Sequence, residues 1–231
     1  MSTTTDLAGW TPARRPDATR LVGARVRLDP LDAERHAGDL FAAAHGPGAD
    51  PRLWDHLGYG PFAGVAALRA HLAAQQRSED PRFYAVVDLA TGRAAGVVSF
   101  LRVDPAHGTI EIGHIWFGGP LQRTPQATEA VHLLARHAFD TLGHRRLEWK
   151  CDAANGRSQA AAQRFGFTYE GTFRQHQIVK GRNRDTAWYS IVDGEWPAID
   201  AAFAAWLAPA NFDADGRQRA SLARLRGAVA G

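Results

Sequence analysis

The stretch TIEIGHIWFGGPLQRTPQATEAV, residues 109–131, constrains the fold more than any other part of the sequence. Residues 109–117 are rich in β-branched and aromatic side chains, as a strand prefers, and Gly-Gly-Pro at 118–120 ends that run. Thr124 can then cap a helix whose first residue is Pro125, a position where no amide donor is needed. The pattern predicts a strand, a short loop and a helix in direct succession.

The helix that follows has one apolar face, because Ala127, Val131, Leu134 and Ala138 recur at helical spacing, and Gly143 marks its end. A strand that feeds a helix through a tight loop aims free backbone N–H groups and the positive end of the helix dipole at one place. Such a place suits a phosphate or pyrophosphate. Most strand–loop–helix units bind nothing, so this pattern alone leaves anion binding open.

The whole chain has the composition of an ordinary soluble globular protein, with 45% hydrophobic and 22% charged residues among 231. This length suits one large domain, or one domain with extensions. The formal net charge is only +3 and the basic residues are dispersed among acids. Dedicated nucleic-acid binding is therefore not expected, although a local basic groove for a polyanionic cofactor fits the sequence.

Several classes of protein are disfavoured by what the sequence contains. Cys151 is the single cysteine, so no disulfide forms within the chain, and we expect a buried strand residue rather than a catalytic thiol. No run approaches ~18 apolar residues, so no membrane span is expected. The first ten residues do not resemble a signal peptide, and the cytoplasm is the expected location. We also expect no metal site, because no Cys/His/acid cluster is evident.

The other elements follow from the same kinds of pattern. Strands are predicted at 22–28, 82–89, 94–103, 146–152, 167–179 and 185–192, and helices at 32–44, 63–77, 155–165, 197–207 and 216–228. Asp32 and Asn155 can cap the helices that begin there, and Gly166 ends the helix at 155–165. KGRNR, residues 180–184, is predicted to connect the last two strands. The crossover helix makes strands 109–117 and 146–152 parallel, and a cofactor would bind where their carboxyl ends part.

The chain is expected to consist of one domain with an extension at each end. A tail or strap covers 1–20, the α/β domain covers 21–195, and a helical extension covers 196–231. The extension carries Trp206, Leu222 and Leu225. These apolar side chains could pack on the same domain or on a second subunit, so a homodimer stays open.

With its motifs, this order of elements resembles the GNAT superfamily of N-acetyltransferases, and within it the Rim-type branch of ribosomal-protein N-terminal acetyltransferases. The resemblance covers about residues 21–195 and is carried by IEIGHIWF (110–117), LQRTPQATEA (121–130), NGRSQAAAQRFGFTYEGTFR (155–174) and KGRNRDTAWYS (180–190). It implies the GNAT fold, an α/β fold with a mixed, mostly antiparallel sheet of six to seven strands. Helices flank this sheet, and its parallel pair is splayed at the acyl-CoA site.

The resemblance also implies an activity: transfer of the acetyl group of acetyl-CoA to a primary amine, on a protein N-terminus or a small molecule, by direct attack in a ternary complex. Two alternatives stay open. The donor could be a longer acyl-CoA such as succinyl-CoA, whose carboxylate Arg174 could pair with. The domain could also be a degenerate, regulatory CoA-binding module. No metal, nucleic acid or membrane is implied.

The cofactor site implied by the resemblance has three parts. The backbone of Ile115, Trp116 and Phe117 would hold the pantetheine arm as an added strand would. The loop of Gln122, Arg123, Thr124, Pro125, Gln126, Ala127 and Thr128 would hold the pyrophosphate. Asn155 and Ser158, one turn apart on a helix, would complete it. Pro125 stands where the family usually has Gly; we expect the site to be retained, because the neighbouring amides stay free.

The candidate catalytic residues are Glu111, His114 and Ser158. By resemblance Glu111 is the candidate base, and the alternative is a buried, satisfied carboxylate or a charge at the rim of the site. His114 titrates in a suitable range, but strand alternation puts it opposite Glu111 unless a bulge intervenes. Ala162 stands where many family members have a Tyr that protonates the departing thiolate of CoA. Ser158 is therefore the candidate partner of that thiolate.

The acceptor side is expected to be flanked by two mixed aromatic and polar segments. One carries Trp54 and Tyr59, and the other carries Arg174 and His176. Both segments could equally be surface cover.

Overall fold

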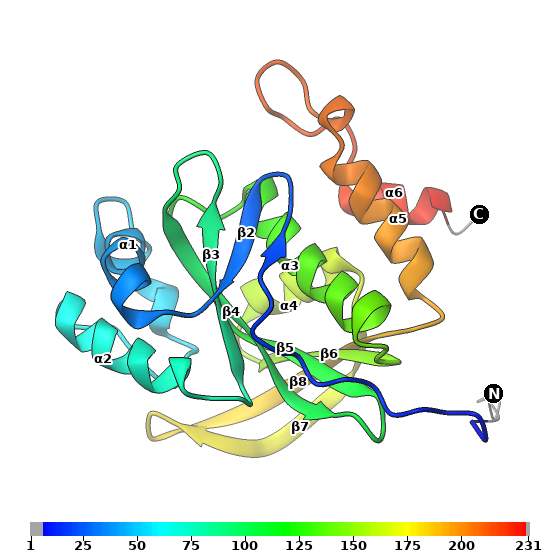
Figure 1. Cartoon of the computed structure of the whole chain (residues 1–231), viewed down its shortest axis with the longest axis horizontal. Helices are drawn as coiled ribbons and strands as arrows, with labels where there is room; N and C mark the ends of the chain where they lie inside the picture. Colours follow the sequence, from blue (N-terminus) through cyan, green and yellow to red (C-terminus); the bar gives the residue numbers. More distant parts are fainter. Residues whose placement is uncertain (1–6, 230–231) are drawn as a thin grey trace.

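The computed structural model describes residues 7–229, and its centre is a single eight-stranded sheet with the order β1-β2-β3-β4-β5-β6-β8-β7 (Figure 1). Among the strands of the described residues, β5 and β6 form the one parallel pair, and all other neighbours are antiparallel. The strands are β1 Leu21–Val22, β2 Val26–Pro30, β3 Arg82–Asp88, β4 Ala94–Asp104, β5 Thr109–Phe117, β6 Arg146–Asp152, β7 Thr168–Val179 and β8 Arg182–Val192. The mixed α/β fold with one parallel pair is as predicted.

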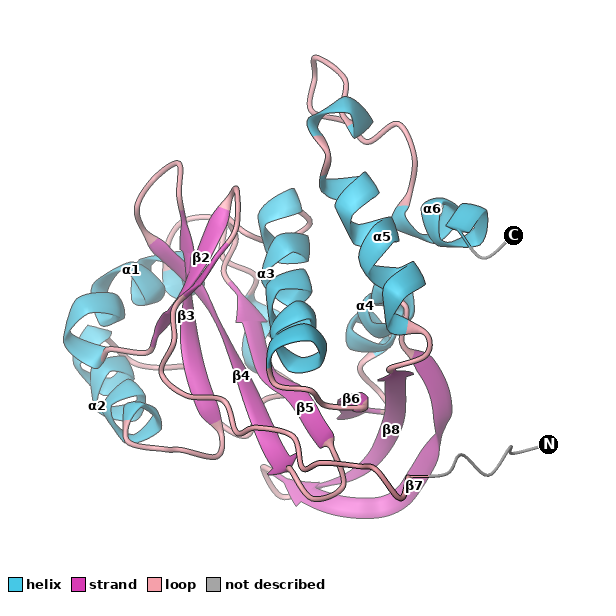
Figure 2. Ribbon diagram, turned by 45° about the vertical axis from the view of Figure 1, so that its right-hand side comes forward, coloured by secondary structure: helices cyan, strands magenta, loops and turns pink. Residues whose placement is uncertain are grey.

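Helices cover both faces of the sheet and create two cores (Figure 2). Helices α1 (Ala33–His45) and α2 (Val65–Gln76) pack on one face, around Leu40, Leu72 and Trp116. Helices α3 (Pro125–Arg136), α4 (Gly156–Phe165) and α5 (Trp196–Leu207) pack on the other. The remaining helical segments are the short turns Pro51–Trp54 and Pro209–Asn211, the π-helical continuation of α3 at His137–Thr141, and α6 (Leu222–Val229).

The predicted helix caps are confirmed in the structure. Asp32 accepts a hydrogen bond from the Arg35 amide at 2.9 Å, and Asn155 accepts one from the Ser158 amide at 3.1 Å. Gly166 ends α4 with a φ of 101°, a left-handed conformation that favours glycine. These signals are local, which is why the sequence pattern was sufficient to find them.

Two predicted boundaries at the end of the chain are wrong. KGRNR is not a five-residue connection, because Lys180 and Gly181, with φ of 49° and 73°, make the turn and β8 begins at Arg182. The last helix begins at Leu222 rather than at residue 216. The side-chain oxygen of Asn211 accepts a hydrogen bond from the Ala220 amide at 2.9 Å, and this bond holds the preceding residues in a loop.

The sheet has eight strands rather than six or seven because the predicted strand 22–28 is interrupted. Its break is held by Glu129 of α3, whose buried carboxylate accepts hydrogen bonds from the amides of Ala24, Arg25 and Val26 at 3.1, 2.7 and 2.8 Å. Residues 21–22 turn back as β1 and pair with β2. One side chain thus satisfies the backbone that the missing ladder leaves open.

Both ends of the described chain pack against the domain. The indole N–H of Trp10 donates to the carbonyl of Ala106 at 2.9 Å, and the backbone carbonyl of Asp17 accepts a hydrogen bond from the Tyr84 hydroxyl at 2.9 Å. At the other end, Phe203 and Trp206 of α5 belong to the same core as α3 and α4. Among residues 7–229, none of the helices is long and apolar enough to cross a membrane.

The Glu129 junction generates a prediction about stability. Glu129→Ala removes the acceptor of three amides, two of which belong to the break itself, and we expect it to lower the free energy of unfolding by about 3 kcal/mol. Urea denaturation measures this change. Glu34→Ala is the matched control, because the Glu34 side chain is 82% exposed and forms an ion pair with the exposed Arg69; we expect a change within about 0.5 kcal/mol. Equal effects of the two variants would contradict the role of Glu129.

Candidate functional site

The carboxyl ends of the parallel strands part, as the sequence predicted. β5 and β6 pair from Thr109 and Arg146 up to Ile112 and Trp149. Beyond that point β5 continues against β4 to Phe117, whereas β6 continues against β8 to Asp152. An opening therefore forms beside the last five residues of β5. An extended ligand arm could enter there and bond to the strand backbone.

A bulge in β5 sits at the start of this opening. Gly113 faces Ser99 and Trp116 faces Val97, so three steps along β5 match two along β4. His114 takes up the extra residue with a φ of 50°. Ile112 consequently faces the core under α3, and Trp116 faces the core under α1 and α2. The condition under which Glu111 and His114 can share one face of the sheet is met.

Glu111 is buried and ion-paired. Its Oε2 atom lies 2.7 Å from Nη1 of Arg102 and 3.0 Å from Nζ of Lys150. Lys150 also contacts Glu148 at 2.6 Å and lies 3.7 Å from the centre of the Trp188 ring. The alternating charges compensate one another where the side chains of Glu111 and Lys150 are almost completely buried. This arrangement matches the alternative of a buried, satisfied carboxylate. If Glu111 acts as a base, it must accept the proton while it is part of an ion-pair network.

His114 is enclosed by aromatic rings. Its imidazole stacks on Tyr59 with ring centres 5.9 Å apart and lies 5.2 Å from Phe83. Burial, together with the nearby charge of Arg102, lowers the pKa of His114 to about 4. The imidazole is therefore neutral at physiological pH. A neutral imidazole can accept a proton, and here its surroundings disfavour the charged product.

The aromatic loop, residues 49–62, arches over the opening and is tied to it from three sides. His56 contacts Asp152 at the end of β6 at 3.0 Å, and Arg157 of α4 pairs with Asp50. Lys180, in the β7–β8 turn, donates to the carbonyls of Trp54 and Gly60 at 2.9 and 3.0 Å, and to that of Tyr59 at 3.3 Å. Sequence reasoning missed these anchors, since nothing local marks them.

The two aromatic residues predicted for the acceptor side occupy different places. The Trp54 side chain is buried, and its ring lies 5.3 Å from Trp116 and 5.5 Å from His45. Tyr59 instead lies against His114 and, with ring centres 4.5 Å apart, against His71 of α2. Burial raises the pKa of Tyr59 and lowers that of His71. His71 is a further candidate residue for the acceptor side, and the sequence analysis did not identify it.

Arg174 and His176 lie in an irregular part of β7, the outer strand of the sheet. His176 contacts the Thr186 hydroxyl at 3.0 Å, and Thr186 pairs with Asp152 in the neighbouring β6. His176 thereby reaches the end of β6 near the opening. Arg174 is exposed on the same strand.

The start of α4 lies beside the parted strands. The Oγ atom of Ser158 accepts a hydrogen bond from Nε1 of Trp149 at 2.9 Å, and the same side chain also hydrogen-bonds to Cys151. Burial raises the pKa of Cys151, as expected for an unreactive thiol. Ala162 is fully buried in the core, where a tyrosine side chain would need space that neighbouring atoms fill.

The loop before α3 offers two backbone donors. The Thr124 hydroxyl caps the helix by accepting from the Ala127 amide at 3.3 Å, and the side-chain NH₂ group of Gln122 donates to the carbonyl of Phe117 at 2.9 Å. Within the described part of the chain, the amides of Arg123 and Gln126 have no hydrogen-bond partner. Arg123 has a φ of 62° and an exposed side chain. These donors at a helix N-terminus suit a phosphate.

The burial of His114 predicts a pH dependence of stability. Because the pKa of His114 is lower in the folded than in the unfolded chain, the unfolded chain binds more protons between about pH 4 and 6.5, and stability rises with pH in that window. His114→Asn, which tolerates the left-handed backbone, should make the dependence shallower. Chemical denaturation at several pH values measures both proteins, and parallel curves would contradict this account.

Comparisons with known proteins agree with this geometry. The model of the family described as acetyltransferase (GNAT) domain matches residues 25–168. The solved structure of a GCN5-related N-acetyltransferase from Brucella melitensis is 48% identical, with a TM-score of 0.92 over 94% of this chain and 98% of that chain. The microcin C7 self-immunity acetyltransferase MccE, solved in complex with acetyl-CoA and AMP, shares the fold at 23% identity, with a TM-score of 0.60 over 74% of this chain and 93% of that one.

A curated relative is similar in sequence over part of its length. The ribosomal-protein-serine acetyltransferase of Escherichia coli (strain K12) is 32% identical over 101 residues, which are 43% of this chain and 56% of that protein. The chain thus spans little more than half the length of that relative. The family model, in contrast, matches more than half of this chain and includes β5, the loop before α3 and α4. This chain belongs to the GNAT acetyltransferase family.

Proposed function

We propose that this protein transfers the acetyl group of acetyl-CoA to a primary amine by direct attack in a ternary complex. The observation that carries the proposal is the opening between β5 and β6 beside two free amides at the start of α3. An acyl-CoA has an extended pantetheine arm and a pyrophosphate, which these two features suit. Family membership supports the same donor, and MccE, which shares the fold, was solved with acetyl-CoA bound.

The proposed reaction assigns a role to each candidate residue. The amine nitrogen attacks the thioester carbonyl carbon, a C–N bond forms and the C–S bond breaks. Backbone N–H groups of residues 115–117 would polarise the carbonyl. Glu111 would take the proton of the amine, directly or through water, and Ser158 would donate a hydrogen bond to the departing thiolate.

Direct binding tests the proposal first. Isothermal titration with acetyl-CoA should give saturable binding. The absence of binding at millimolar acetyl-CoA would contradict the proposed function. Thiol release should then be followed with an amine panel that includes a peptide with N-terminal serine, since one relative is a ribosomal-protein-serine acetyltransferase. Faster turnover with succinyl-CoA would favour the longer donor. Binding of acetyl-CoA without thiol release would favour a regulatory CoA-binding module. Pro125 and Ala162 suggest this alternative, because both depart from the usual family residues.

The cofactor loop generates a prediction about affinity. Arg123→Glu replaces an exposed cation next to the free amides with a carboxylate that repels the pyrophosphate, and we expect the Kd for CoA to rise about tenfold or more. Arg136→Glu makes the same change of charge at the exposed far end of α3 and should change the Kd less than about twofold. Equal effects would indicate that only the total charge matters and that CoA lies elsewhere.

The candidate base generates a prediction about turnover. Glu111→Gln keeps the shape of the side chain and should lower kcat by about 10²–10⁴-fold with little change in CoA affinity. Glu148→Gln is the matched control, because Glu148 pairs with the same Lys150 and stands opposite Glu111 in the neighbouring strand. Only Glu111→Gln should cause this loss of turnover; Ser158→Ala should cost less, because water can replace a hydroxyl donor.

Two results would contradict the assignment of the base. If Glu111→Gln keeps wild-type turnover while His114→Asn loses it, the base is His114. If both variants keep it, proximity and backbone polarisation account for the rate.

A further inference from the structure

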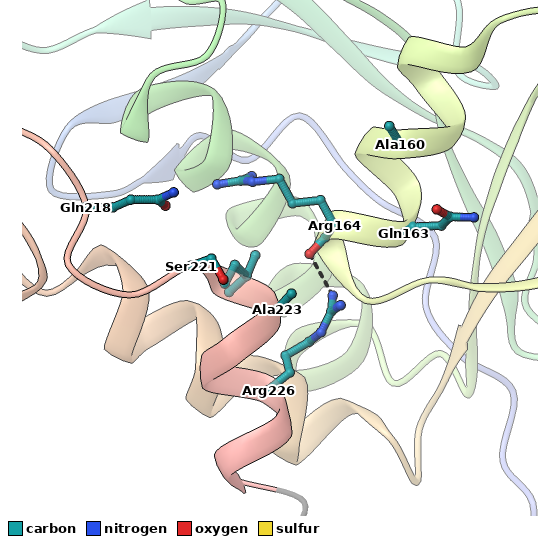
Figure 3. A pocket seen from close by; sticks show the side chains of 8 residues that line it. Ala160, Gln163, Arg164, Gln218, Ser221, Ala223 and Arg226 are labelled. Carbon is teal, nitrogen blue, oxygen red and sulfur yellow. Dashed lines mark hydrogen bonds between the residues drawn. The ribbon is translucent and has the colours of Figure 1, made fainter.

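A hollow of about 480 Å³ lies between α4 and the end of the chain (Figure 3). Gln163 and Arg164 of α4 form one wall, and Gln218, Ser221 and Arg226 form the other. The second wall lies beyond residue 168, where the match to the family model ends. The hollow is therefore built partly from a segment that the family's common domain does not include.

The hollow carries positive charge without compensation. Among the described residues, Arg164 and Arg226 form no ion pair with a carboxylate, and no acidic side chain lines the hollow. Burial lowers the pKa of both guanidinium groups, and the charge of Arg226 lowers that of Arg164 further. Two cations that line one hollow without a carboxylate counterion favour the binding of an anion.

Contacts with the protein fix the donors in place. Nη1 of Arg164 donates to the Thr128 hydroxyl at 3.1 Å, and the guanidinium lies 4.8 Å from the centre of the Trp206 ring. Gln218 accepts a hydrogen bond from Nε1 of Trp206 at 2.7 Å through its oxygen, so its NH₂ group remains to donate. Nη1 of Arg226 donates to the Arg164 carbonyl at 2.6 Å, and its other N–H groups remain. Such a set of donors suits the oxygens of a phosphate.

The hollow also lies close to the loop that we propose for the pyrophosphate. Thr128 is four residues after Thr124, about 6 Å along the axis of α3 at 1.5 Å per residue, and Arg164 bonds to Thr128 directly. In CoA the ribose carries the pyrophosphate on its 5′ carbon and a phosphate on its 3′ carbon. The two anionic groups are thus one sugar apart, which matches two anion-binding places joined by the Arg164–Thr128 contact.

We propose that this hollow binds the 3′-phosphate at the nucleotide end of CoA, and that the C-terminal segment completes the cofactor site by supplying Gln218 and Arg226. The proposal rests on the proposed function, because it requires CoA at the start of α3. It gives α6 a role in cofactor selection in addition to packing.

The test compares CoA with 3′-dephospho-CoA, which lacks only this phosphate, by isothermal titration of the full chain. The wild type should bind CoA about tenfold or more tightly than 3′-dephospho-CoA. Arg226→Gln should weaken CoA by about the same factor and leave 3′-dephospho-CoA within about twofold, so the preference is lost. Arg226→Lys, which keeps the charge, should retain part of it.

Arg224→Gln is the matched control, because it removes the same charge from the same helix. Arg224 is exposed and does not line the hollow. It should keep the full preference for CoA. Thermal unfolding of each variant verifies the fold. The preference for CoA over 3′-dephospho-CoA can be measured on the wild type alone. The proposal therefore stays testable if Arg226→Gln unfolds.

Three results would overturn the proposal. Wild-type protein that binds both ligands equally would remove the 3′-phosphate from the hollow and leave the proposed function intact. Equal weakening of both ligands by Arg226→Gln would point to a structural role for Arg226. Binding of adenosine 3′,5′-bisphosphate or inorganic phosphate without binding of CoA would show an anion site unrelated to the donor, and would also contradict the proposed function.

Discussion

One extra residue in β5 determines how this molecule is arranged around its opening. A regular strand would have continued to alternate, with Glu111 and His114 on opposite faces. The bulge at His114 brings both to the side of the sheet that α2 and the aromatic loop cover, and it sends Trp116 into the core under α1. The left-handed backbone of His114 carries a cost that the surrounding packing must offset.

The parted strands are enclosed by charge on one side and by apolar packing on the other. Glu111, Lys150 and Glu148 form a row on the face opposite α3, and the cation of Lys150 rests on Trp188. On the α3 face, Leu147, Trp149 and Cys151 of the same strand are buried in the main core. A single strand thus separates an ion-pair network from a hydrophobic core, and its strict alternation keeps the two apart.

The sequence was sufficient wherever the determining contacts are local. The caps at Asp32 and Asn155 and the glycine that ends α4 lie within a few residues of what they stabilise. The parallel pair followed from the crossover connection. The bulge at His114 could not be predicted, because it depends on the register against β4, and the start of β8 depends on a turn that Lys180 and Gly181 make alone.

The candidate site was predictable only where a motif carried it. The loop before α3 and the start of α4 could be named in advance, but which of the loop's amides are free follows from hydrogen bonds that only coordinates give. The uncompensated pair of Arg164 and Arg226 joins residues 62 positions apart. Nothing in the spacing of either residue indicates the other.

The ammonium group of Lys180 has a consequence for motion of the aromatic loop. Three carbonyls of the aromatic loop share this one donor group, although the loop and the β7–β8 turn are about half the chain apart. Releasing one carbonyl gains the loop little freedom while two others still hold it. The loop and the hairpin tip should therefore open together or stay closed together, as one cooperative unit rather than as two independent segments.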